Sequence, residues 1–241
     1  MPLFQKIVAE AATIPLMEEF CLTGLGEPLL DKDIIERIKY IREHLAAVPI
    51  TLYTNGTYLT NEKAVALRDA GLSTLYVSLN AVNREKRFQI MKLSDYDQVE
   101  QQTKDAIAIG GDRMKVIVKA VCSKDLMEHG EADTFLDTWG GDFTTGGHAF
   151  LHLEGNWAGG MWPMRVKPTT PCSRALNQIM VLWDGRVSLC CFDGDGEVIF
   201  GDLNRQTIRE VFAGEAATSY RRAHSEGRRG ELKLCATCTA I

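Results

Sequence analysis

The residues of this chain best suited to chemistry are the cysteines of its last third. Cys172 stands alone, Cys190 and Cys191 are adjacent, and Cys235 and Cys238 form a Cys-x-x-Cys pair. Thiolates are soft ligands that suit zinc and iron–sulfur clusters, and a two-residue gap lets both sulfurs turn onto one centre. The spacing therefore favours a metal or cluster site over a set of scattered buried thiols.

A predicted hairpin brings one of the adjacent cysteines to this site. Asp184-Gly185 is a strong tight-turn signal, so residues 177–183 and 186–190 are expected to pair as antiparallel strands. Successive side chains of a strand point to opposite faces, so only one of Cys190 and Cys191 is expected to face the other ligands. The second would be a small buried apolar residue.

A second group of candidate residues follows three predicted strands. In parallel α/β folds, ligands bind at the C-terminal ends of strands, and glycines there allow a close approach to the backbone. Taken singly, each segment is explained as well by a structural turn or a polar strand end. The segments are Gly24-Leu-Gly26-Glu27-Pro28, Thr54-Asn55-Gly56 and Ser78-Leu-Asn80.

The elements that must position these residues alternate along the chain. Hydrophobic periodicity predicts strands at 20–23, 50–53, 74–79, 114–121 and 150–153, and helices at 4–12, 32–45, 61–70 and 96–109. Asn61 is the expected cap of the third helix, which Gly71 ends. The alternation predicts an α/β fold with a parallel sheet, open or part of a barrel. A composition shift near residues 161–171 separates a domain at 1–165 from one at 166–241.

Composition excludes several classes of partner. The 241 residues are 45% hydrophobic and 24% charged, as in ordinary globular proteins, and the net charge of −5 gives no support to nucleic-acid binding. No apolar run is long enough to span a bilayer. Seven cysteines without an export signal indicate metal or redox use in the cytoplasm rather than a disulfide framework.

Together these segments resemble the radical SAM enzymes that carry a C-terminal SPASM-type auxiliary-cluster domain. The resemblance rests on the three strand-end segments in this order, the Gly185-x4-Cys190 hairpin, Gly201-Asp-Leu203 leading into residues 208–212, and the closing cysteine pair. The cysteine spacing is most similar to that of the short, twitch-type aminocyclitol dehydrogenases. The resemblance to the family implies a partial (β/α)6 barrel lacking its first strand and cluster loop, followed by a small twitch domain of hairpin and helix.

The resemblance also implies roles for individual residues. The Gly26-Glu27-Pro28 segment would meet the methionine part of S-adenosylmethionine, and Ser78 and Asn80 would meet the ribose region. Gly24 and Asn55 are further implied cofactor-binding residues. Residues 118–121 would lie near adenine. His152, Glu154, Asn156 and Trp157 are candidates for the substrate pocket. The implied ligands of one auxiliary [4Fe–4S] cluster are Cys172, Cys190, Cys235 and Cys238.

One departure from the family pattern is serious. Radical SAM enzymes hold their radical [4Fe–4S] cluster on a Cys-x3-Cys-x2-Cys loop, and no such triplet occurs in this sequence. Either an N-terminal segment is missing or the radical cluster has been lost, with truncation favoured because the later motifs are intact. As written, the chain is expected not to form the 5′-deoxyadenosyl radical; that cluster would be present only with the missing loop.

For the intact protein, the resemblance implies that S-adenosylmethionine is cleaved and that the resulting radical abstracts a hydrogen from a small molecule or peptide. The auxiliary cluster would either accept the substrate electron or bind the substrate directly, and flavodoxin or ferredoxin would be the reductant. Two other classes stay open. One is a non-catalytic iron–sulfur electron-transfer or binding module on the same scaffold. The other is a structural protein whose four cysteines hold zinc.

Overall fold

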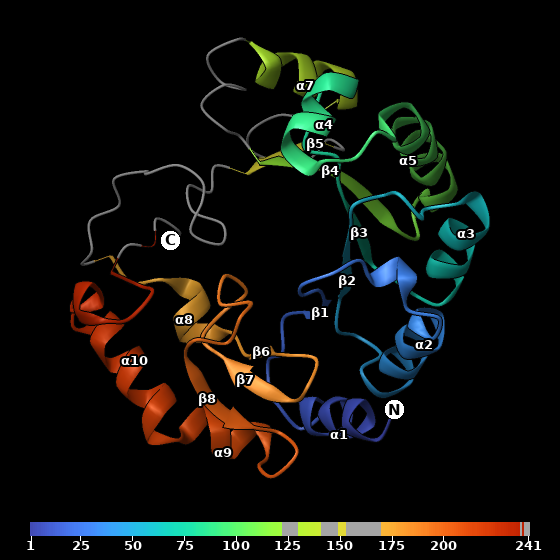
Figure 1. Cartoon of the computed structure of the whole chain (residues 1–241). Helices are drawn as coiled ribbons and strands as arrows, with labels where there is room; N and C mark the ends of the chain where they lie inside the picture. Colours follow the sequence, from blue (N-terminus) through green and yellow to red (C-terminus); the bar gives the residue numbers. More distant parts are fainter. Residues whose placement is uncertain (122–129, 141–148, 153–169, 237, 239–241) are drawn as a thin grey trace. The chain divides into compact units, whose positions relative to one another are not determined.

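The computed structural model describes residues 1–121, 130–140, 149–152, 170–236 and 238. The chain divides into two compact units, which are described separately below (Figure 1). One is Pro15–Leu153, and the other combines Met1–Ile14 with Glu154–Ile241. None of the described helices is both long and apolar enough to cross a membrane.

The unit Pro15–Leu153 is built on a five-stranded parallel sheet in the order β1-β2-β3-β4-β5. The strands are β1 (Phe20–Leu22), β2 (Ile50–Thr54), β3 (Thr74–Ser78), β4 (Lys115–Val121) and β5 (Ala149–His152). The helical segments are η1 (Pro28–Leu30), α2 (Ile34–His44), α3 (Asn61–Asp69), α4 (Arg84–Met91), α5 (Tyr96–Gly110) and α7 (Glu131–Trp139). The predicted parallel α/β sheet is confirmed, with strand positions within one or two residues.

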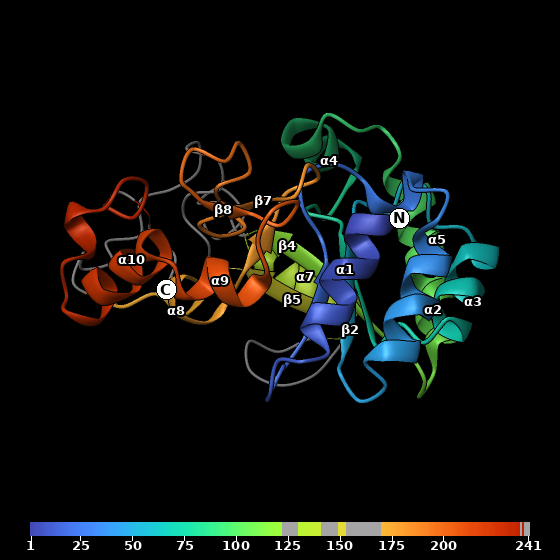
Figure 2. The ribbon, with the colours of Figure 1, turned by 90° about the horizontal axis from the view of Figure 1, so that it is seen from below.

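The two faces of this sheet differ in character. Leu52, Leu75 and Val116 share one register row and are buried, on the face that α2, α3 and α5 cover (Figures 1 and 2). On the neighbouring row, Tyr53 and Tyr76 are half-buried and stack with ring centroids 4.4 Å apart. The pleat therefore separates an apolar core from a face that carries aromatic and polar side chains.

Two details of this unit differ from expectation. Thr60, not Asn61, caps α3, because the Thr60 hydroxyl accepts a hydrogen bond from the Lys63 amide at 3.3 Å. The sequence also gave no sign of α4. The buried residue of that helix is Arg87, which is charged. A helix is predicted from the regular spacing of apolar side chains on its buried face, and α4 lacks that signal.

The second unit contains a small antiparallel sheet in the order β6-β7-β8. Its elements are α1 (Pro2–Ala11), α8 (Ser173–Asn177), β6 (Met180–Val181), β7 (Arg186–Ser188), β8 (Ile199–Asp202), α9 (Ile208–Ala213), α10 (Glu215–Ser225) and η3 (Arg229–Glu231). Thr207 and Glu210 form a capping box at the start of α9. The predicted hairpin is present, but its strands are shorter than predicted.

Helix α1 belongs to this second unit by its contacts, although the boundary predicted from sequence grouped it with the parallel sheet. Glu10 Oε2 accepts a hydrogen bond from the Ile208 amide at 2.7 Å, and Lys6 Nζ donates to the Gln206 carbonyl at 2.6 Å. A carboxylate beside the unsatisfied amides of a helix start stabilises that start. Contacts from α1 thus fix the first turn of α9.

The hairpin corrects one step of the ligand argument. Strand β7 ends at Ser188 after an irregularity between Val187 and Ser188, so Cys190 and Cys191 lie in the turn beyond it. The two cysteines therefore do not belong to the strand on which they were predicted to lie, and strand alternation does not decide which of them faces the other ligands. The backbone amide of Asp193 closes the turn by donating a hydrogen bond to the Cys190 carbonyl at 3.0 Å.

Candidate cluster site and strand-end cofactor site

Cysteines from three separate segments meet in the core of the C-terminal unit. Cys172 and Cys235 are each 7% exposed and belong to one buried cluster, and Cys190 packs against it. Cys238 is half-buried and interacts electrostatically with both Cys190 and Cys235. The structure therefore brings together the four cysteines singled out in the sequence. Cys191, half-buried, adjoins Cys190.

Burial, aided by the neighbouring thiols Cys191, Cys238 and Cys235 and opposed by one backbone hydrogen bond, raises the pKa of the Cys190 thiol to about 12. Burial likewise raises the pKa of Cys235 to about 11, although the charge of Arg229 opposes that shift. Without a bound cation these thiols hold their protons. Binding a metal centre would require their deprotonation.

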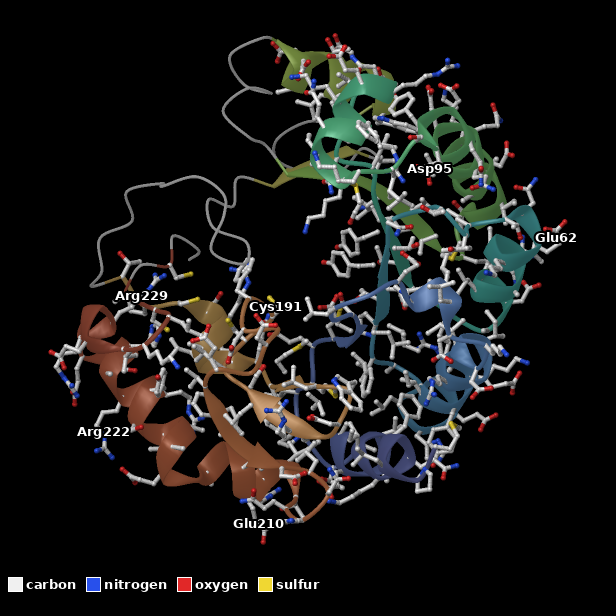
Figure 3. All side chains as sticks on the ribbon, in the orientation of Figure 1. Glu62, Asp95, Cys191, Glu210, Arg222 and Arg229 are labelled. Atoms are coloured by element: carbon white, nitrogen blue, oxygen red, sulfur yellow. The ribbon has the colours of Figure 1, made fainter. Side chains whose placement is uncertain are left out.

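A buried arginine follows the ligand segments closely. Arg229 is 1% exposed, and its guanidinium donates to the carbonyls of Cys235 at 3.2 Å, Cys238 at 2.7 Å and Thr170 at 3.3 Å (Figure 3). Each of these carbonyls lies in a segment that carries a candidate ligand. Nothing in the sequence distinguishes this arginine from the adjacent Arg228; the difference is visible only in the folded chain.

His224 of α10 holds the segment that carries Cys172. Its Nδ1 accepts a hydrogen bond from the Cys172 amide at 3.2 Å. Burial, and then the charge of Arg229, lower the pKa of His224, so the imidazole is neutral. Its Nε2 is buried and has no hydrogen-bond partner among the described residues.

The donor set fits a [4Fe–4S] cluster. Four cysteines from separated segments share one largely apolar core, and thiolates are the ligands that such clusters take. Within the part of the chain that the structure describes, no disulfide joins these cysteines, and no three ligating side chains already surround a single ion position. Each thiolate of a [4Fe–4S] cluster binds a different iron, so convergence on one point is not what this cofactor needs.

The second candidate site lies at the C-terminal ends of the parallel strands, and Glu27 organises it. Its Oε1 accepts hydrogen bonds from the Thr54 hydroxyl at 2.6 Å and the Leu29 amide at 2.9 Å, and its Oε2 from the Asn55 amide at 2.7 Å. The carboxylate thus ties the loop after β1 to the end of β2. Gly26 precedes it at φ +107°, with open space where a Cβ would lie.

Arg87 fixes the next two strand ends. Its side chain is fully buried and donates to the Asn55 carbonyl at 2.9 Å, the Leu79 carbonyl at 3.0 Å and Asp95 at 2.6 Å. Thr57 also donates to Asp95, at 2.6 Å (Figure 3). Burial alone would raise the pKa of Asp95, but the hydrogen bonds from Arg87 and Thr57 and the charge of Arg87 lower it. This pair was not predicted from the sequence.

The third segment lies at the end of β3. Asn80 is 6% exposed with φ +56°, a left-handed conformation that asparagine tolerates. Its amide donates to the Lys119 carbonyl at 3.1 Å, and its Nδ2 contacts Met91 Sδ at 3.4 Å. Ser78 ends β3 opposite Lys119 in the register. The candidate residues of the three strand ends thus lie along one edge of the sheet.

The remaining candidates are placed as follows. Gly24 lies in the exposed turn after β1, and Pro28 opens η1. Residues 118–121 lie in β4, and His152 ends β5. Glu154, Asn156 and Trp157 fall outside the described residues.

A parallel α/β sheet with polar strand ends, together with a four-cysteine domain, defines a class of cofactor-binding iron–sulfur protein. Comparison with known families agrees. The radical SAM superfamily matches residues 3–123, and an iron–sulfur cluster-binding domain of the SPASM type matches residues 172–239. The chain therefore belongs to the radical SAM superfamily. S-adenosylmethionine and iron–sulfur are the cofactors that these matches assign to it.

Individual relatives are similar over different lengths. An S-adenosyl-L-methionine-dependent 2-deoxy-scyllo-inosamine dehydrogenase of Niallia circulans is 22% identical over 239 residues, covering 99% of this chain and 80% of the relative. A probable GTP 3′,8-cyclase of Methanocaldococcus jannaschii is 36% identical over 122 residues, which is 50% of this chain and 40% of that protein.

Solved structures show the same fold. The crystal structure of BtrN in complex with AdoMet and 2-DOIA aligns over 100% of this chain and 80% of its own, with a TM-score of 0.67 and 18% identity. Native anSMEcpe with bound AdoMet aligns over 92% of this chain and 74% of its own, with a TM-score of 0.69 and 14% identity.

Proposed function

We propose that this protein is a radical SAM oxidoreductase that removes hydrogen from a small molecule or peptide and carries one auxiliary [4Fe–4S] cluster on Cys172, Cys190, Cys235 and Cys238. The observation that carries the proposal is the shared buried core of these cysteines in a chain of this superfamily. The similarity to a dehydrogenase over nearly the whole chain supports oxidation as the reaction. When bound, the auxiliary cluster supplies one-electron transfer.

The strand-end residues divide into two roles under this proposal. The Glu27 carboxylate already accepts three hydrogen bonds from the protein, so it acts by holding the loop and leaves the open backbone at Gly26 to meet the ligand. Arg87 holds Asn55, and Leu79 just before Asn80, by hydrogen bonds to their backbone carbonyls. Ser78 and Asn80 supply the side chains for the ribose region of S-adenosylmethionine.

Anaerobic reconstitution of the chain tests the cluster. Iron and sulfide in equal amounts, matching one [4Fe–4S] cluster per chain, with the broad visible absorption of such clusters, are expected. Zinc bound in place of iron, or no metal, would contradict the proposal. The expected iron and sulfide content would also exclude the structural zinc protein.

Titration with S-adenosylmethionine tests the strand-end site. Binding to this chain is expected to be weak, because no cysteine triplet is present to supply an iron ligand for the amino acid end. Asn80→Ala should weaken it further, whereas Asn61→Ala, an exposed asparagine at the start of α3, should not. Equal affinities of both variants and the wild type would remove Asn80 from the site.

A second candidate function is an iron–sulfur electron-transfer module on the same scaffold. The observation in its favour is the absence of a Cys-x3-Cys-x2-Cys triplet from these 241 residues. A chain extended at its N-terminus by a loop bearing that triplet separates the two candidates. The enzyme proposal expects 5′-deoxyadenosine after reduction in the presence of S-adenosylmethionine. Its absence from a fully iron-loaded extended chain would favour the electron-transfer module.

A further inference from the structure

Within the described part of the chain, no acidic side chain forms an ion pair with Arg229. The guanidinium is 1% exposed, and it donates hydrogen bonds to three backbone carbonyls, at Thr170, Cys235 and Cys238. No ion pair within the described residues includes it. Asp193, a buried carboxylate of the same region, accepts instead from the amides of Glu197 and Val198 at 2.7 and 3.0 Å.

A buried charge without a counter-charge is costly. Backbone carbonyls satisfy the hydrogen bonds of a guanidinium but leave its net charge in a poorly solvated core. Arginine keeps its proton under all ordinary conditions, so it does not escape this cost by becoming neutral. An arginine in such a place therefore points to an anion that belongs in the same core.

The candidate cluster is such an anion. A [4Fe–4S] centre with four thiolate ligands has a net negative charge, and it gains one more on reduction. All three carbonyls that Arg229 contacts lie on the segments that carry Cys172, Cys235 and Cys238, so the guanidinium adjoins the place that the cluster would occupy. Net charge and hydrogen bonding near a cluster set its reduction potential.

We propose that Arg229 is the built-in counter-charge of the auxiliary cluster, a positioning residue that raises the cluster's reduction potential and holds its first and last ligand segments together. The inference rests on the proposed function, since it requires the cluster. The fixed positive charge stabilises the more negative, reduced cluster, so its presence makes the cluster easier to reduce. The planar fork reaches several carbonyls at once, which a lysine ammonium does not reproduce.

The adjacent arginine provides a matched control. Arg228 differs by one position, but its side chain is 46% exposed and it pairs with Glu226 and Glu231. Substitution of either arginine by glutamine changes the net charge of the protein equally. Only the loss of Arg229 should affect the cluster, because a solvent-exposed charge is screened.

The experiment compares wild type, Arg229→Gln, Arg229→Lys and Arg228→Gln after anaerobic reconstitution of the full chain. Iron and sulfide content, the reduction potential from a mediated optical titration, and the rate of iron release to a chelator are measured. Arg229→Gln should have a lower potential than wild type and release iron several-fold faster. Arg229→Lys should keep a potential closer to wild type but release iron faster, since it retains the charge and loses the fork. Arg228→Gln should behave as wild type.

The other outcomes would refute either the proposed function or the role of Arg229. A wild-type chain that takes up no cluster refutes the proposed function itself. A wild-type chain with a cluster, and Arg229→Gln with an unchanged potential, overturns the role of Arg229. Where Arg229→Gln takes up no cluster, Arg229→Lys decides: a cluster near the wild-type potential supports the counter-charge, and failure to bind one overturns it.

Discussion

Replacement of Arg87 by methionine should strongly destabilise the unit that carries the strand-end site. The guanidinium is fully buried, Asp95 is 15% exposed, and their nearest nitrogen and oxygen atoms are 2.6 Å apart. Methionine fills similar space but leaves the Asp95 carboxylate without its cation and the carbonyls of Asn55 and Leu79 without a donor. Removal of one partner from a buried ion pair costs about 3–5 kcal/mol.

An exposed pair of the same geometry provides the control. Arg113 and Asp69 are also 2.6 Å apart, but their side chains are 63% and 48% exposed. Water screens such a pair, so Arg113→Met should cost about 1 kcal/mol or less. The two variants share the substitution and the interatomic distance. They differ in burial, and Asp69 also keeps a second partner, Arg68, at 2.9 Å.

Urea unfolding followed by hydrogen exchange of peptides from β2 and β3 restricts the measurement to this unit. With an m-value of about 2 kcal/mol/M, a loss of about 4 kcal/mol lowers the midpoint by about 2 M urea. The double variant Arg87→Met with Asp95→Asn should recover part of the loss, because no charge is left unpaired. Equal midpoints for Arg87→Met and Arg113→Met would refute this account of Arg87.

Three further predictions concern the two candidate sites. Cys190→Ala should abolish or destabilise the cluster, whereas Cys191→Ala should leave iron content and spectrum nearly unchanged and cost about 1 kcal/mol of stability; the reverse pattern would show that the ligand is Cys191. Because the pKa of Asp95 is lowered in the folded state, the stability that its charge contributes is complete above its unfolded pKa of about 3.9 and is lost as the pH falls through the lower folded pKa. The free energy of unfolding of wild type should therefore fall relative to that of Asp95→Asn as the pH is lowered through this range. Parallel curves for the two proteins would contradict the assignment. Glu27→Ala should speed hydrogen exchange at the Asn55 amide, which loses its 2.7 Å acceptor, and unchanged protection would show that the carboxylate does not hold this loop.

The sequence was sufficient for the parallel sheet because the pattern there is dense. Leu52, Leu75 and Val116 belong to buried strands whose alternation is legible without knowledge of their neighbours. Helix α1 shows where such reasoning ends. Its periodicity identifies an apolar face but does not say which element covers that face. The Ile208 amide that donates a hydrogen bond to Glu10 lies near the other end of the sequence.

The candidate ligands could be found from spacing, but the residues that hold them could not. Cysteines are rare enough for a short interval such as that between Cys235 and Cys238 to be informative. Arginines are common on surfaces, so the pattern predicts exposure for Arg87 and Arg229 alike. The correction at Cys190 has a similar cause, because the irregularity that ends β7 depends on pairing with β8 and leaves no local signature.

The two buried arginines perform the same mechanical task with different electrostatics. Each directs its fork at backbone carbonyls of segments that carry candidate site residues, Arg87 at Asn55 and Leu79, and Arg229 at Cys235 and Cys238. Arg87 has a carboxylate, Asp95, so its charge is compensated by the protein itself and its strand ends are held in the absence of any ligand. Arg229 contacts only carbonyls among the described residues, and the proposal above assigns its compensation to the cluster. Under the proposals above, the strand-end site is held by the fold itself, whereas the cysteine site would be completed electrostatically only when an anionic cluster is present.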